Sequence, residues 1–262
     1  MDAWFVVNGT ESFPDRLARE LAGNTVDGAG TLARHALRGL RACIETAEGA
    51  DVKALLGWAQ KLMDARPAIG AIASLLQHWL ESMPAAEGGS DDMRTVAIRH
   101  CDHVLARADA AFEQTMQLGR ARLSGISGSI VTHSASSTVR HLLADLAPDR
   151  VIVGASEPGG EGRRLAAELG VRCVSDAEAV RRVAEAGAVL VGADAVGTQT
   201  FVNKVGTLAL AQAACDADTL FFVVAESFKW VAVADPVVVE SAFETVPNAL
   251  VGQFLSDGLF RS

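Results

Sequence analysis

The chain has 262 residues, half of them hydrophobic, and carries a formal net charge of -9. A chain of this length can bury a large core in one or two domains, so we expect an ordinary globular protein. The negative charge excludes a protein that attracts nucleic acid or an anionic membrane non-specifically, because both need a basic surface. No apolar run has the length of a bilayer span and the N-terminus lacks the pattern of a secretory signal, so we expect a cytoplasmic protein.

No motif for a metal or a nucleotide cofactor stands out. The four cysteines are far apart, with no CxxC pair and no histidine at the spacing of a zinc site. Residues 154–162, "GASEPGGEG", are glycine-rich but match neither the G-x-G-x-x-G pattern nor the Walker pattern. We therefore expect neither a metal nor a cofactor.

Residues 24–123 have the spacing of amphipathic helices. Apolar residues recur three and four positions apart in four segments, residues 31–47, 51–65, 67–83 and 91–123. Asp51 is suited to cap the second helix, and Pro67 to the first turn of the third. The hydrophilic residues 85–92 indicate a long loop. The pattern predicts an N-terminal helical domain over residues 1–123.

From residue 124 onward, short apolar runs alternate with helical segments. Runs that are nearly all apolar are typical of parallel strands covered by helices on both faces. The pattern predicts an α/β domain over residues 124–262, a Rossmann-like doubly wound parallel sheet. Ligands of such sheets bind outside the carboxyl ends of the strands. We expect four strand-end segments to meet at one rim, namely residues 132–136, 154–162, 192–194 and 225–230.

Asp194 ends one of these apolar strands, in the sequence "LVGAD". Burial at such a place raises the pKa of a carboxyl group, which suits proton transfer at a carbon atom or at a sugar hydroxyl. The alternative is that Asp194 caps the following loop or forms an ion pair with Lys204. The residues alone leave both interpretations open.

Asn203 and Lys204 come just before a helix of small apolar residues. The free N–H groups and the dipole of a helix start favour an anion, and Lys204 supplies a formal charge, so a phosphate is the expected occupant. The alternative is that Lys204 only neutralises Asp194.

The junction "VTHSASSTVR" places His133, Ser134 and Ser136 at another helix start, where a serine is first of all a cap. Adjacent strand residues point to opposite faces, so we exclude a serine hydrolase built on His133 and Ser134. In the helical half, residues 28–31 and Arg66 lie at helix starts, where they act either as caps and turns or as anion contacts.

The chain resembles the initiation factor 2B-like superfamily along nearly its whole length. The motifs that carry this resemblance are "DGAGTLARHAL", "IVTHSAS", "ASEPGGEGRRLAAEL", "GADAVGTQTFVNKVGTLALAQAA", "FFVVAESFKW" and "FETVPNALVGQFLSDG". The superfamily contains regulatory subunits of translation initiation factor 2B, methylthioribose-1-phosphate isomerase and ribose-1,5-bisphosphate isomerase. The resemblance implies a helical domain followed by a Rossmann-like domain, and a homodimer or higher homo-oligomer formed through the C-terminal half.

In the isomerases that the chain resembles, an Asp and a Cys form the acid/base pair that converts an aldose phosphate into a ketose phosphate. The matching residues here are Asp194 and Ser134, so a hydroxyl stands in place of the thiol. The matching Asn203 and Lys204 imply a sugar-phosphate pocket. Further candidate substrate contacts are His133, Ser136, Gly28, Ala29, Gly30 and Arg66.

Two further departures concern arginines. In many members of the superfamily an arginine follows the Ser-Glu pair, and "SEPGG" lacks it; in the isomerases an arginine precedes the Gly-Ala pair, where this chain has Asp27. Three functions remain open. The chain is a sugar-phosphate isomerase, which is an intramolecular oxidoreductase; or a non-catalytic regulatory or scaffold subunit that binds a phosphorylated sugar or nucleotide; or an enzyme with altered chemistry on a related ligand. In each case we expect no nucleic acid and no membrane as partner.

Overall fold

The computed structural model describes residues 12–24, 26–47, 51–67, 69–84, 93–231, 236, 238 and 240–258. Its first part is helical: α1 (Phe13–Gly23), α2 (Ala29–Thr46), α3 (Val52–Asp64), α4 (Gly70–Glu81) and α5 (Met93–Ser124). The four predicted helices are confirmed as α2 to α5. Helix α1 was not predicted, although Ser12 caps it and Leu17 and Leu21 bury its apolar face.

Two predicted helix signals have different outcomes. Asp51 caps α3, because its Oδ1 accepts a hydrogen bond of 2.8 Å from Ala54 N. The expectation for Pro67 is wrong, since α4 begins at Gly70 and Pro67 lies in the preceding turn, which Ile69 N closes by donating to Arg66 O. The predicted loop over residues 85–92 lies outside the described residues.

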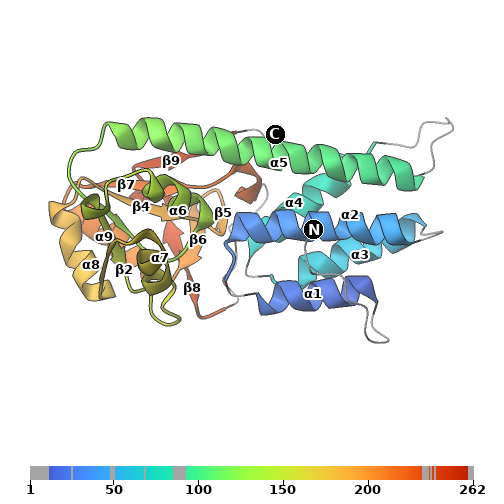
Figure 1. The fold of residues 1–262 in the computed structure, drawn as a ribbon, viewed down its shortest axis with the longest axis horizontal. Helices are drawn as coiled ribbons and strands as arrows, with labels where there is room; N and C mark the ends of the chain where they lie inside the picture. Colours follow the sequence, from blue (N-terminus) through green and yellow to red (C-terminus); the bar gives the residue numbers. More distant parts are fainter. Residues whose placement is uncertain are drawn as a thin grey trace.

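A six-stranded sheet forms the second part of the molecule (Figure 1). Every neighbouring pair of its strands is parallel, and their order is β3-β2-β1-β4-β7-β9. Its strands are β1 (Ile130–Thr132), β2 (Val151–Gly154), β3 (Arg172–Val174), β4 (Ala188–Gly192), β7 (Leu220–Val224) and β9 (Gln253–Leu255). The central strands β1, β2 and β4 are buried along their whole length, as expected for strands covered on both faces. The predicted doubly wound α/β fold is confirmed.

Helices pack on both faces of this sheet. They are α6 (Ser137–Ala144), α7 (Glu161–Leu169), α8 (Asp176–Arg182) and α9 (Thr207–Asp216). Leu142 of α6 and Leu165 of α7 belong to one apolar cluster, whereas Ala179 of α8 and Leu210 of α9 belong to another. The two clusters use alternate residues of the buried strands, which is why the strands are apolar throughout.

A second, antiparallel sheet was not predicted. It pairs β5 (Ala195–Val196), β6 (Thr200–Lys204) and β8 (Phe243–Pro247) in that order. Asn203 and Lys204 come just before helix α9, as expected, and they are the last two residues of strand β6. Strand β8 comes about 40 residues after β6 in the chain, so no local sequence pattern indicates that the two strands pair.

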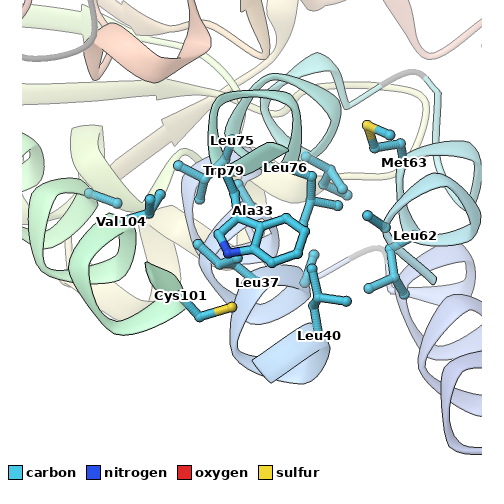
Figure 2. Packing of buried hydrophobic residues seen from close by; sticks show 14 of the residues in the cluster. Ala33, Leu37, Leu40, Leu62, Met63, Leu75, Leu76, Trp79, Cys101 and Val104 are labelled. Carbon is cyan, nitrogen blue, oxygen red and sulfur yellow. The ribbon is translucent and has the colours of Figure 1, made fainter. Parts of the chain in front are cut away.

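The helical part has its own apolar core, in which Trp79 of α4 packs among Leu37, Leu40, Leu76 and Cys101 (Figure 2). Helix α5 runs along both parts of the molecule (Figure 1). Its first half contributes buried residues to the helical core and its last turns contribute Met116 and Leu123 to the sheet core. A boundary between residues 123 and 124 remains a prediction. Among the described residues, no helix combines the length and apolar character needed to cross a bilayer.

Candidate functional site

A pocket of about 170 Å³ lies where the helical part meets the carboxyl ends of the strands. Each of the four strand-end segments contributes to it: Ser134 follows β1, Glu161 follows β2, Asp194 follows β4 and Lys229 follows β7. The remaining lining residues are Val26, Asp27, Gly28, Ala29, Arg66, Ile69, Ala135, Ser136, Ala193, Asn203, Lys204, Glu240, Ala242 and Phe243. The convergence of the four segments agrees with the binding rule for doubly wound sheets.

Asp194 is held by its backbone, which donates a hydrogen bond of 2.9 Å to Val202 O of strand β6. Its side chain is half-buried. Burial raises the pKa of Asp194 to about 6, against the opposing charges of Lys229 and Arg66. A carboxyl group with this pKa exchanges its proton readily near neutral pH, which is what acid/base chemistry requires.

Lys204 is buried and lies opposite Glu161, with 2.9 Å between Nζ and Oε1. Its ammonium group also donates to Pro158 O. The alternative in which Lys204 is the ion-pair partner of Asp194 is therefore wrong. Asn203 donates from Nδ2 to Thr207 Oγ1 over 2.9 Å, which ties the end of β6 to the first turn of α9.

Lys229 was missed in the sequence, although its segment was expected at the rim. The 3-10 turn Ser227–Lys229 follows β7 and buries this lysine to 2% exposure. Its Nζ lies 2.8 Å from Glu226 Oε2, and Glu226 is fully buried. A lysine and a glutamate in "AESFKW", directly after a wholly apolar strand, were the signal for a buried charged pair.

Four predicted site residues lie at helix or turn starts in the pocket wall. Ser136 caps α6 and accepts a hydrogen bond from Val139 N. Gly28 caps α2, and a Cβ there would lie 3.1 Å from Ser137 N, so the starts of α2 and α6 approach each other closely. Ala29 opens α2. Ser134 has a φ of +71° and donates from its backbone to Ser156 Oγ over 2.7 Å.

Arg66 completes the wall from the connection between α3 and α4. Its Nη1 donates to Asn24 O and its Nε lies 3.9 Å from Glu240 Oε1. Only 11% of its side chain is exposed. Arg66 is one of the cations that lower the pKa of Asp194, against the larger effect of burial.

His133 and Gly30 lie outside the pocket lining. His133 is buried, with Nε2 at 2.7 Å from Val205 O and Nδ1 at 3.3 Å from Ser156 Oγ. Burial lowers the pKa of His133, which favours the neutral ring. Gly30 faces Glu226, where an added Cβ would lie 2.8 Å from Oε1. Both residues lie behind the pocket wall, so neither contacts a ligand in this pocket directly.

The pocket carries charges of both signs. Its carboxylates are Asp27, Glu161, Asp194 and Glu240, and its cations are Arg66, Lys204 and Lys229. Carboxylates accept hydrogen bonds from hydroxyl groups, and cations attract phosphate. In the described part of the chain, no group of three or more His, Cys, Asp or Glu side chains is arranged to hold a metal ion. The arrangement suits a small ligand that has both hydroxyl groups and an anionic group.

Comparison with known proteins gives a consistent picture. A model of the initiation factor 2 subunit family, IF-2B, matches residues 25–247. A Pyrococcus abyssi protein described as translation initiation factor eIF-2B subunit 2-like is 31% identical over 236 residues, which are 83% of this chain and 80% of that protein. A Pyrococcus horikoshii protein with the same description is 27% identical over 228 residues, 82% of this chain and 78% of that protein.

Solved structures share the fold at lower identity. Pyrococcus horikoshii translation initiation factor eIF-2B has a TM-score of 0.78 at 23% identity, covering 94% of this chain and 95% of that one. The 5-methylthioribose 1-phosphate isomerase of the same organism has a TM-score of 0.69 at 18% identity, covering 93% and 82%. The family model spans most of the sequence and a relative above 30% identity matches over most of its length, so the chain belongs to the initiation factor 2 subunit family.

Proposed function

We propose that the pocket binds a small phosphorylated sugar and that Asp194 is its acid/base group. The observation that carries this proposal is the half-buried Asp194, with its pKa raised to about 6, in a pocket whose wall contains Arg66, Lys204 and Lys229. A carboxylate with such a pKa accepts a proton from one carbon of the sugar and returns it to the neighbouring carbon. The reaction class is aldose–ketose isomerisation.

The size of the pocket favours a single sugar phosphate over a nucleotide. Its volume of about 170 Å³ is below the roughly 300–1,000 Å³ of pockets that enclose drug-sized ligands. The phosphate is expected beside Lys204 and the starts of α2 and α6, where N–H groups and a cation meet. The sugar hydroxyls then face the carboxylates.

A second candidate function is a non-catalytic subunit that binds the same ligand as a signal. Ser134 supports it, because a hydroxyl is a far weaker acid than the thiol at the matching position of the isomerases. Among the described residues, no basic side chain is hydrogen-bonded to Ser134 Oγ to activate it. The eIF-2B descriptions of the relatives agree with this function.

A ligand screen followed by a product assay separates the two. The purified protein is heated with ribose 1,5-bisphosphate, methylthioribose 1-phosphate, ribulose 1,5-bisphosphate or nucleoside monophosphates. A ligand well above its Kd raises the melting temperature by a few degrees. Stabilisation with turnover that Asp194→Asn abolishes supports the isomerase, and stabilisation without turnover supports the signalling subunit. No stabilisation by any compound contradicts both.

Replacing Ser134 by Cys tests the missing thiol directly. If the remaining residues still form an isomerase site, Ser134→Cys raises turnover of the stabilising sugar phosphate above that of the unmodified protein. Ser136→Cys is the matched control, because it places a thiol in the same wall. Equal turnover in both variants would contradict the explanation by a lost thiol.

We also infer that the chain forms a homodimer or a higher homo-oligomer in the cytoplasm. Support comes from the shared fold of a tetrameric eIF2B-beta2-delta2 complex from C. thermophilum, which has a TM-score of 0.75 at 20% identity and covers 94% of this chain and 90% of that one. Light scattering coupled to size-exclusion chromatography measures the mass, and a monomer at micromolar concentration would contradict the inference.

A further inference from the structure

We propose that Glu226 is a positioning residue that holds the ammonium group of Lys229 at the pocket wall. The inference extends the proposed function, since Lys229 lines the pocket and Glu226 does not. Glu226 lies directly behind Lys229, and it is fully buried. Lys229 Nζ is 2.8 Å from its Oε2.

The carboxylate of Glu226 is fixed from two other helices. Thr138 of α6 donates from Oγ1 to Glu226 Oε1 over 3.1 Å. Arg34 of α2 places Nη1 at 3.9 Å from the same oxygen. Gly30, one turn before Arg34, leaves no room for Glu226 to move toward α2, since even a Cβ would lie 2.8 Å from Oε1. Thr138 and Arg34 both approach Oε1, so Oε2 is the oxygen that faces Lys229.

The surrounding charges explain why Lys229 depends on this one carboxylate. Arg34 also has a surface partner, with Nε at 3.6 Å from Asp109 Oδ1. Lys229 has no other carboxylate within 4.0 Å among the described residues. Burial raises the pKa of Glu226, but Lys229, with smaller contributions from the backbone and Arg34, holds the pKa below its ordinary value. A buried carboxylate that stays charged keeps a fixed counter-charge for Lys229.

Helix α2, helix α6 and the 3-10 turn Ser227–Lys229 therefore determine together where the ammonium group of Lys229 lies. The starts of α2 and α6 form part of the pocket wall, and their residues Arg34 and Thr138 also hold Glu226. Among the nearby cations, Lys229 lowers the pKa of Asp194 most strongly. Glu226 thus fixes the cation that faces the acid/base group without itself touching a ligand.

The test uses the small number of lysines. The chain contains four, Lys53, Lys61, Lys204 and Lys229, so 15N-lysine labelling gives few ammonium signals. Only Lys204 and Lys229 are buried, at 3% and 2% exposure, and their protons should exchange slowly enough for detection. Lys204→Met and Lys229→Met assign the two signals.

Glu226→Gln should abolish the Lys229 signal or speed its proton exchange at least tenfold, and leave the Lys204 signal unchanged. Glu161→Gln is the matched control and should affect Lys204 alone, because Glu161 is its partner. An unchanged Lys229 signal in Glu226→Gln would overturn the proposal. Loss of both signals together would also overturn it, since that result indicates a general structural role. If Glu226→Gln does not fold, Thr138→Val removes one donor to the carboxylate and should speed Lys229 exchange severalfold; unchanged exchange then contradicts the proposal.

Titration with inorganic phosphate separates this inference from the proposed function. We expect Glu226→Gln to weaken phosphate binding about tenfold. If the unmodified protein binds neither phosphate nor any sugar phosphate, the proposed function fails, whereas the ammonium signals still decide the role of Glu226.

Discussion

Burial of the Asp194 carboxyl group lowers the free energy of unfolding at neutral pH. Its pKa is 3.8 in an unfolded chain and about 6 in the folded protein, because burial disfavours the charged form. Between these values the folded protein binds more protons than the unfolded one, so the free energy of unfolding decreases as pH rises. The stability that the folded protein gains by keeping this carboxyl group protonated is fully present below pH 3.8 and is lost above about pH 6. The shift corresponds to at most about 3 kcal/mol.

Asp194→Asn should therefore raise the free energy of unfolding at pH 8 by about 1–3 kcal/mol and change it little near pH 3.5. Urea unfolding at both pH values measures the difference. Asp149→Asn is the control, because Asp149 is exposed. A gain of equal size at both pH values would show that the carboxyl group is not the cause.

The two pocket lysines should act differently on Asp194. Lys229 opposes the raised pKa more strongly than Lys204, whose charge faces Glu161. Lys229→Met should raise the pKa of Asp194 further above 6, and Lys204→Met should raise it less. Carboxyl 13C shifts of aspartate-labelled protein, followed against pH, give both values. The opposite order would refute the assignment of Lys229 as the main counter-charge.

At the scale of elements, the contact of α7 with β2 depends on a glycine. A Cβ on Gly162 would lie 1.8 Å from Gly154 O, a backbone atom that cannot rotate away. Helix α7 carries Glu161, which binds Lys204, so its distance from the sheet also sets one wall of the pocket. The helix must move outward if this position carries a side chain.

Gly162→Ala should destabilise the protein by about 2–3 kcal/mol, in the range of an overpacked core. Gly57→Ala is the matched control, because Gly57 lies within α3 and nothing lies within 4 Å of an added Cβ. There alanine should stabilise by roughly 0.5–1 kcal/mol. Urea unfolding compares the two, and destabilisation of the same size in both would contradict the close approach of α7 and β2.

At the scale of the whole molecule, the helical part and the sheet part share structural elements. Helix α5 buries residues in both cores, and Phe228, which follows strand β7, belongs to the helical core. The pocket lies between the two parts and takes residues from each. Separation of the parts would therefore expose apolar surface and open the site at once.

We expect the two cores to unfold together. Native-state hydrogen exchange should give the same opening free energy for the amides of Leu37 in α2 and Leu190 in β4, because α5 contributes buried residues to both of the cores in which they lie. A clear difference between the two, with the helical amides opening first, would instead support two independently folding domains divided near residues 123 and 124.

The sequence by itself determined that a helical part comes first and that apolar strands then alternate with helices, and hence the fold class, because apolar periodicity is a local property. It also placed Asp194 at a strand end, because chain order alone decides which residue follows a strand. Only the tertiary structure decided that Lys204 faces Glu161, 43 residues away, rather than Asp194. The same holds for the pairing of β6 with β8, the orientation of His133 into the interior and the buried pair of Glu226 and Lys229. These contacts join segments that are distant in the chain, so they depend on register and packing, which local patterns do not contain.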